Sequence, residues 1–226
     1  MSTTGFARAR TDEQRLERRE AILATAATML LTVRVNDLSL NELARRVGLA
    51  KSNVLRYFES REAVLLELYA RENTAWLDAV ESALAAAQTV DVDVVARAVA
   101  ACAAERPVFC DLTASAASVL EHNVSADVAA AYKRDAIAGA YRLAEIVSEY
   151  LGEFSVATGT VFVGGVLLVI GGVWASSQPS AGMAAAYREH PELKDFRLDF
   201  TFAVSEIIAT LLVGLQHREA RNGTNA

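Results

Sequence analysis

The 226-residue chain contains few of the residues that cross-link or break a fold, with 2 cysteines, 3 prolines and 7% aromatic residues. Two cysteines, Cys102 and Cys110, are too few for a disulfide framework in a chain of this length. Neither belongs to a C-x-x-C pair and no histidine lies close to either in the sequence, so the usual zinc patterns are excluded and no metal site is expected. We therefore expect two reduced thiols buried in helices.

Other missing patterns exclude further classes of protein. A chain that is 53% hydrophobic and 22% charged is too apolar to be disordered. Residues 1–10 lack the apolar core of a signal peptide, so the expected location is the cytoplasm. The motifs G-x-G-x-x-G after a strand, the P-loop, H-E-x-x-H and G-x-S-x-G are all missing, which predicts a protein that is not an enzyme and needs no cofactor.

The formal net charge of −6 conceals an uneven distribution of charge along the chain. Residues 1–61 hold 11 Lys and Arg against 7 Asp and Glu, whereas residues 62–226 hold 11 against 21. A basic N-terminal part on an acidic body predicts that the N-terminal part contacts nucleic acid.

Apolar residues recur at helical spacing through almost the whole chain, and no stretch alternates with the period of a β-strand. The sequence therefore predicts an all-α fold of about nine helices. The expected helices cover residues 11–33, 40–47, 51–58, 61–87, 92–104, 107–121, 125–151, 155–176 and 192–216.

The second and third of these helices have the features of a helix-turn-helix. Ser39 and Glu42 form the S-x-x-E capping box that starts the first, and Gly48 ends it because glycine adopts the left-handed conformation without strain. A helical wheel places Val54, Leu55 and Phe58 on the core face of the second. The opposite face has no carboxylate, which suits a helix that reads base edges in a major groove. The alternative is an exposed helix pair that does not bind DNA, and such a pair would not need a face of this kind. Its residues are Ser52, Asn53, Arg56 and Tyr57.

Residues 38–69, LSLNELARRVGLAKSNVLRYFESREAVLLELY, resemble the DNA-binding domain of the tetracycline-repressor (TetR) family of transcriptional regulators. The resemblance implies a three-helix head, a long connecting helix from Arg61, an all-helical body and homodimers on palindromic operator DNA. Under it we expect a disordered leader over residues 1–11, a helix-turn-helix DNA-binding domain over 12–60 and a ligand-binding and dimerisation domain over 61–226.

The resemblance also predicts individual DNA contacts. The position of Leu55 is usually held by Tyr in the family, so Tyr57 would have to supply the hydroxyl that contacts the DNA backbone. The predicted contacts are Lys51, Ser52 and Asn53 at the start of the recognition helix, Arg56 and Tyr57 on its outer face, Ser39 and Asn41 on the preceding helix, and Arg61 as a phosphate contact.

The apolar segment 155–176 permits two interpretations, because no charged residue occurs between Glu153 and Arg188. Its length matches a transmembrane helix, which would make the chain a helical membrane-associated protein. Five glycines and the lack of flanking Lys or Arg instead favour a helix buried between the core and a partner subunit. By the resemblance, segments 155–176 and 192–216 would build a dimeric four-helix bundle.

Polar side chains interrupt the apolar helices of the body, and nearby aromatic residues could line a cavity with them. Any single one of these polar side chains could equally be an ordinary core residue whose hydrogen bonds are made within the protein. With the resemblance, the pattern predicts a repressor released from its operator by a small, largely apolar effector. The candidate ligand-binding residues are Trp76, Phe109, Asp111, Thr113, Tyr141 and Trp174.

Overall fold

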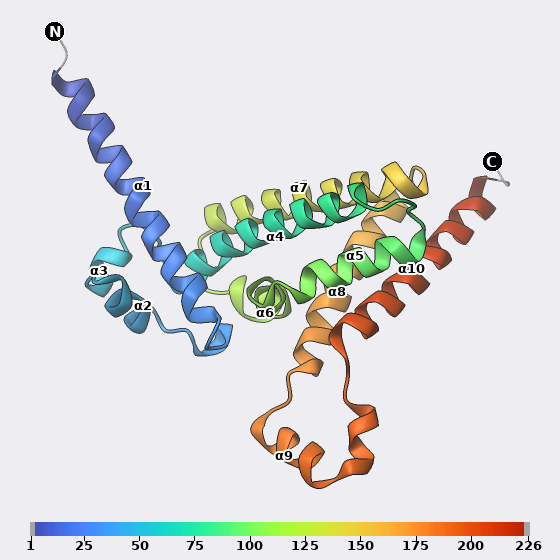
Figure 1. Cartoon of the computed structure of the whole chain (residues 1–226). Helices are drawn as coiled ribbons and strands as arrows, with labels where there is room; N and C mark the ends of the chain where they lie inside the picture. The colour runs from blue at the N-terminus through green and yellow to red at the C-terminus, as the bar shows by residue number, and fades with distance from the viewer. Residues whose placement is uncertain (1–2, 224–226) are drawn as a thin grey trace. The chain divides into compact units, whose positions relative to one another are not determined.

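The computed structural model describes residues 3–223, which form ten α-helices with short 3₁₀ and π segments and no β-strand (Figure 1). The prediction of an all-α fold is confirmed, with one helix more than expected. The contacts divide the chain into two compact units. Unit 1 combines Met1–Arg71 with Ser115–Lys133, and unit 2 combines Glu72–Ala114 with Arg134–Ala226.

Unit 1 contains α1 (Thr3–Leu30), α2 (Leu40–Val47), α3 (Lys51–Val54) and the first part of α4 (Arg61–Ala85). The helix α2 packs on α1, and α3 follows α2 after a tight turn (Figure 1). Each helix turns its apolar side toward a shared core, as an amphipathic pattern requires. That core includes Ile22, Leu23, Ala26, Met29, Leu43, Ala44, Val54, Phe58, Val64 and Leu65.

The second segment of unit 1 adds a π-helical turn, Ala116–Leu120, and the start of α7 (Ala126–Leu151). The backbone N–H of Ser125 donates to the carboxylate of Glu59, at a distance of 2.5 Å. The rings of Tyr69 and Tyr132 lie with their centroids 6.1 Å apart. These contacts attach the N-terminal end of α7 to the segment that follows α3.

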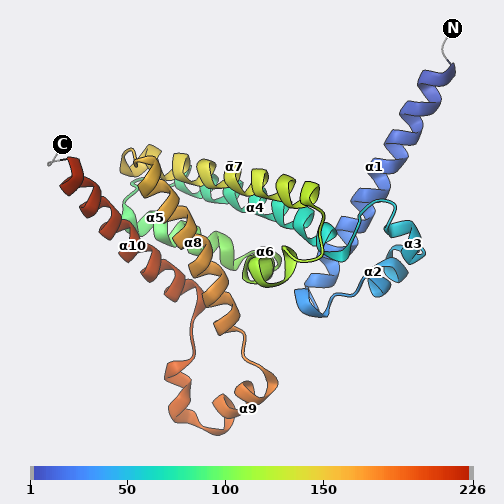
Figure 2. The same ribbon diagram turned by 180° about the vertical axis from the view of Figure 1, so that it is seen from behind.

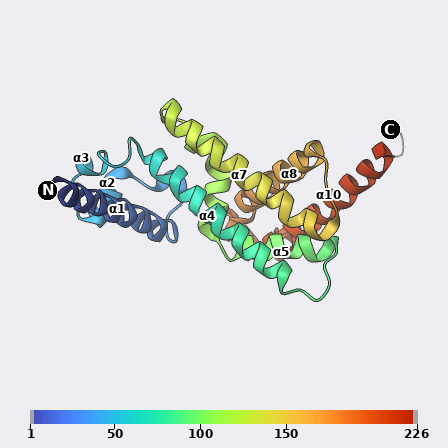
Figure 3. The same cartoon turned by 90° about the horizontal axis from the view of Figure 1, so that it is seen from above.

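Unit 2 contains the rest of α4 and α7, together with α5 (Val92–Ala104), α6 (Pro107–Ser115), α8 (Val156–Ser177) and α10 (Phe200–Gly223). The helix α10 packs on α5 and α8, as Figure 2 shows from behind. The helices α4 and α7 run side by side (Figure 3), joined by ion pairs from Arg142 to Asp78 at 2.7 Å and to Glu81 at 2.5 Å.

An excursion of the chain between α8 and α10 contains α9 (Ala181–Glu189) and a 3₁₀ segment, Pro191–Phe196 (Figures 1 and 2). The expectation of a helix over residues 192–216 is wrong at its start, because α10 begins only at Phe200. The Asp199 carboxylate caps α10 by accepting the N–H of Phe202 at 2.8 Å. The helix α9 was not predicted, although Ser180 caps it by accepting the N–H of Met183.

The helix α1 begins at Thr3, within the leader that the sequence analysis expects over residues 1–11. Residues 1–2 of the expected leader lie outside the described residues. The helix expected over 107–121 stops at Ser115 and passes into the π-helical turn.

Two helices of the described chain are long and apolar enough to cross a membrane by length and composition alone, Val156–Ser177 and Phe200–Arg221. In their most apolar windows, 39% and 33% of the residues are buried within the chain. Core helices of water-soluble proteins have the same length and composition, so neither helix by itself favours a membrane span.

Candidate nucleic-acid interface

The helix-turn-helix is built by the caps that the sequence predicts. The Ser39 hydroxyl accepts the N–H of Glu42 at 3.2 Å, which starts α2. The Glu42 carboxylate binds the guanidinium groups of Arg45 and Arg46, at 2.6 and 2.9 Å. These hydrogen bonds, the one from Arg45 first, lower the pKa of Glu42 to about 2. Gly48 ends α2 with a φ of 76°, the left-handed conformation that sets the angle of the turn.

The recognition segment is shorter as an α-helix than predicted. The helix α3 ends at Val54, and the chain continues to Phe58 in hydrogen-bonded turns. Val54 and Phe58 are buried, as expected, but the prediction that Leu55 belongs to the core is wrong, because 41% of it is exposed. The backbone N–H groups of Arg56 and Tyr57 donate to carbonyl groups three residues earlier, which is a tighter turn than that of an α-helix. This tighter turn rotates the side chain of Leu55 outward.

The outer side of the helix-turn-helix exposes the polar residues that the sequence places there. Ser39 and Asn41 are exposed at the start of α2, and Lys51 is exposed at the start of α3. Tyr57 is half-buried. The exposed residues of the recognition segment are Ser52, Asn53 and Arg56.

Arg19 of α1 positions the recognition segment, a role that the sequence analysis missed. Its guanidinium donates to the backbone carbonyl of Tyr57 and pairs with the Glu67 carboxylate of α4. The same group lies 4.2 Å from the centre of the Phe58 ring, a cation–π contact. The signal in the sequence was a charged residue at a core-facing position of an amphipathic helix.

Arg61 is engaged inside the head. Its guanidinium donates to the Glu62 carboxylate at 3.0 Å and to the backbone carbonyl of Leu38 at 3.2 Å. The predicted phosphate contact of Arg61 stays a prediction, and the side chain would have to leave these partners to make it. The observed bonds hold the segment before α2 against the start of α4.

The cations of the head fall into two groups. Arg19, Arg45, Arg46, Arg61 and Arg71 each pair with a carboxylate of the same unit. In the described part of the chain, a second group of exposed cations makes no ion pair with a carboxylate. Its members are Arg15, Arg18, Lys51 and Arg56.

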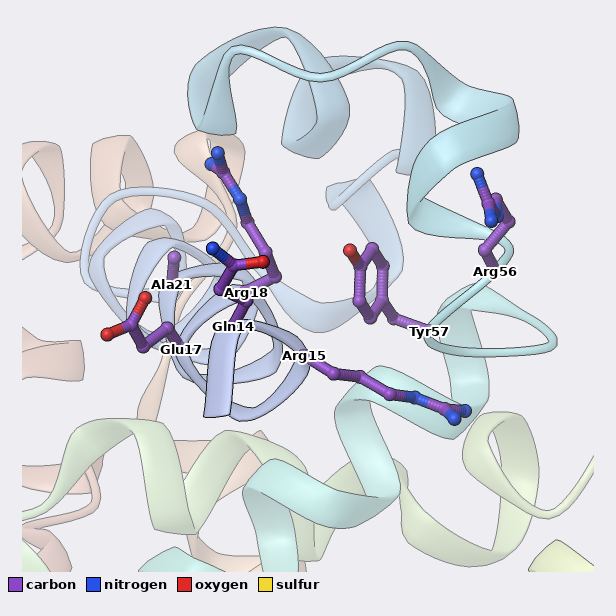
Figure 4. Close-up of a pocket in the computed structure, with 7 residues that line it drawn as sticks. All are labelled: Gln14, Arg15, Glu17, Arg18, Ala21, Arg56 and Tyr57. Atoms are coloured by element: carbon purple, nitrogen blue, oxygen red, sulfur yellow. The ribbon is translucent and has the colours of Figure 1, made fainter. Parts of the chain in front are cut away.

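A cleft of about 880 Å³ brings three of these unpaired cations together, with α1 on one side and the recognition segment on the other (Figure 4). Unpaired positive charge on this surface attracts the phosphates of DNA. The sequence analysis missed Arg15 and Arg18, although both belong to the basic N-terminal part. The cleft is lined by Gln14, Arg15, Glu17, Arg18, Ala21, Arg56 and Tyr57.

Most of the candidate ligand-binding residues of unit 2 pack against one another. Trp76 and Phe109 are buried and stacked, with ring centroids 4.9 Å apart. Trp174 donates its indole N–H to the Asp111 carboxylate at 3.4 Å. The hydroxyl of Thr113 donates to the Phe109 carbonyl at 2.8 Å. None of these five side chains lines the groove described next.

The sixth candidate, Tyr141, lines an open groove between α7 and α8 with a volume of about 760 Å³. The floor is largely apolar, with Ile137 of α7 and Val163 of α8 among its residues. Three carboxylates also line the groove, those of Glu145, Glu149 and Glu153. Volume and lining suit a small molecule with an apolar body.

Both cysteines are buried and unlinked, which confirms the prediction from the sequence. The thiol of Cys110 donates to the carbonyl of Ala103 at 3.2 Å. Burial, and secondarily the nearby Asp111 carboxylate, raises the pKa of the Cys110 thiol to about 12. The thiol therefore stays protonated and unreactive at neutral pH.

Two family models match consecutive parts of the chain. Residues 22–68 match the model described as bacterial regulatory proteins, tetR family. Residues 70–219 match the model described as Tetracyclin repressor-like, C-terminal domain. Together they leave only short segments at the two ends of the chain unmatched.

Individual proteins are also similar to this chain over part or most of its length. The HTH-type transcriptional regulator EthR of Mycolicibacterium smegmatis is 39% identical over 70 residues, which are 29% of this chain and about a third (32%) of that relative. A crystal structure from Shewanella sp. PV-4, described as a tetR family transcription regulator, has a TM-score of 0.50 at 16% identity and covers 86% of this chain and 95% of its own. A transcriptional regulator from Streptomyces coelicolor A3(2) has a TM-score of 0.49 at 18% identity and covers 86% and 98%.

Proposed function

Since the chain belongs to the TetR family of DNA-binding transcriptional regulators, which are not enzymes, we propose that it is a repressor that binds a palindromic operator as a homodimer and is released by a small effector. The observation that carries this proposal is the exposed, carboxylate-free recognition segment with its unpaired cations Lys51 and Arg56. A regulator that acts on DNA in this way works in the cytoplasm of a bacterium.

The proposed DNA surface is centred on the recognition segment. Arg56 has the donors to read a guanine edge, and Asn53 has the amide to read an adenine edge. Lys51 and Ser52, at the start of the recognition segment, are proposed to contact the DNA backbone that borders the groove. The remaining members of the proposed surface are Ser39, Asn41, Tyr57 and Arg61, the last only if it leaves its internal partners.

The proposed dimer forms through α8, which corresponds to the predicted segment 155–176, and α10, which overlaps the predicted segment 192–216 only from Phe200 onward. One face of α8 is apolar and exposed, and Leu168 at its centre is 78% exposed. A Cβ added to Gly172 would meet no atom of the chain within 4 Å, so a second helix has room to approach there. On α10, Phe202, Ile207 and Val213 remain exposed in the single chain.

The proposed effector is a small, largely apolar molecule that binds the groove between α7 and α8. Tyr141 lies in this groove, and α7 is one continuous helix from there to its N-terminal end beside Ser125. The bond from Ser125 to Glu59 connects that end to the recognition segment. An effector that shifts α7 would therefore change the population of heads able to bind DNA. Displacement of the protein from operator DNA, measured over a panel of metabolites and antibiotics, tests this step; a panel without effect would contradict it.

The repressor proposal is tested by footprinting the purified protein on fragments of bacterial genomic DNA. We expect enrichment of one inverted repeat, with its half-sites one helical turn or a multiple of it apart, because two symmetric heads read successive major grooves. Binding without sequence enrichment would contradict the proposal. The genes beside the enriched sites would then identify the class of effector.

A further inference from the structure

The N-terminal half of α1 reaches beyond the packed core of the head. Burial of α1 begins at Ile22, whereas Leu16, about 1.7 turns earlier on the same helix, is 61% exposed. The family model for the DNA-binding domain also begins at residue 22. The residues before Ile22 therefore lie outside both the hydrophobic core and the segment that matches the family pattern.

This half of α1 carries two exposed cations on one face. Arg15 and Arg18 are three residues apart, so their side chains are neighbours on the helix surface. Neither makes an ion pair in the described part of the chain, whereas Arg19 beside them is engaged with Glu67. Like charges at this spacing repel each other and destabilise an isolated helix. A bound polyanion would remove that repulsion.

The same two side chains line a cleft that they share with the recognition segment. Figure 4 shows Arg15 extending from α1 past the Tyr57 ring, Arg18 extending from the same helix in another direction, and Arg56 on the far side of that ring. All four residues line the cleft of about 880 Å³. Glu17 lines it too and places one negative charge among the three arginines. The cleft therefore keeps a positive excess next to the residues proposed to read bases.

We propose that Arg15 and Arg18 bind backbone phosphates of the operator, so that α1 is a second DNA-contacting element beside the recognition segment. The proposal rests on the DNA-binding function proposed above. Guanidinium groups match phosphate oxygens in geometry and form charge-assisted hydrogen bonds with them. Phosphates border the major groove that Arg56 would enter, which places them within reach of the opposite wall of the cleft. Contacts of this kind strengthen binding to every sequence alike.

The test measures binding of the full-length protein to duplex DNA as a function of salt, for the wild type and for the double variant Arg15→Gln/Arg18→Gln. Each lost phosphate contact reduces the slope of log Kobs against log[salt] by about 0.9, so the double variant should lose about 1.8 per protomer. The ratio of affinities for the operator and a shuffled duplex should not change. Arg15→Lys/Arg18→Lys keeps the charge and should keep most of the slope. The matched control is Arg97→Gln, an exposed and unpaired arginine of α5.

A slope for the double variant equal to that of the wild type would overturn the proposal. Thermal unfolding with added inorganic phosphate separates DNA from a small anion. Stabilisation by phosphate that only the wild type shows, together with an unchanged slope on DNA, would make the cleft a small-anion site and would also overturn the proposal. Because phosphate contacts are independent of sequence, the slope is measurable on any duplex. If the wild type prefers no DNA sequence, the proposed repressor function is contradicted. The difference in slope between the wild type and the double variant would still test whether α1 contacts phosphates.

Discussion

At the scale of the residue, the partners of each arginine decide what it can do. Arg19 and Arg61 are held by carboxylates and backbone carbonyls, so they position the segments around α2 and α3. Arg56 has no such partner and is exposed. The spacing of residues in the sequence predicts which side of a helix each one occupies, and it placed Arg56 correctly. It could not predict that Leu55 is exposed, because that depends on where α3 tightens into a turn.

The substitution Arg56→Ala is expected to weaken operator binding by about 1–3 kcal/mol, because a side chain that reads a guanine edge through two hydrogen bonds contributes this much. The lost affinity should depend on the one base pair that Arg56 reads. Changing that base pair in the operator should therefore reduce the affinity of the Arg56→Ala variant only slightly. Anisotropy titrations of both proteins on both duplexes measure the coupling. An Arg56→Ala protein that binds its operator like the wild type would show that the recognition segment is assigned wrongly.

At the scale of the element, local signals predicted most helices and failed where a boundary depends on tertiary contacts. The helix α5 has the predicted bounds, Val92–Ala104, because an aspartate cap and a regular apolar stripe agree. The helix α9 has a serine cap but no buried residue, so it lacks the amphipathic pattern by which helices are found in a sequence. The end of α6 at Ser115 likewise has no breaker residue to mark it.

The turn between α2 and α3 depends on Gly48, whose φ of 76° is unfavourable for a residue with a Cβ. A Cβ at this position would meet no atom within 4 Å, so strain of the backbone is the only cost of Gly48→Ala. We expect the free energy of unfolding to fall by about 1–2 kcal/mol in a urea titration. Gly182→Ala in α9 is the matched control, since this exposed glycine has helical geometry and open space, and it should cause no loss. Equal effects of the two substitutions would contradict this explanation of the turn.

At the scale of the whole molecule, the periodicity of apolar residues predicted an all-α chain, and the distribution of charge predicted a basic N-terminal part. Neither pattern gave any indication that residues 115–133 belong to the same compact unit as the head. The contacts responsible join residues far apart in the sequence, such as Glu59 with Ser125, and no local sequence pattern predicts them. The surplus hydrophobicity of the chain has a similar explanation. Part of it lies on faces of α8 and α10 that a second copy is proposed to cover.

The central claim, that two copies of this chain read one palindrome, is tested most directly by the affinity of the protein for the full inverted repeat and for a single half-site. The comparison uses the wild type, Leu168→Arg, which places a charge on the exposed apolar face of α8, and the control Ala101→Arg at an exposed position of α5. Sedimentation of the three proteins reports their oligomeric state. We predict that the wild type and the control are dimers that bind the full repeat far more tightly than the half-site. Leu168→Arg should be a monomer that binds both duplexes equally weakly. A wild-type protein that binds the half-site as tightly as the full repeat would contradict the account.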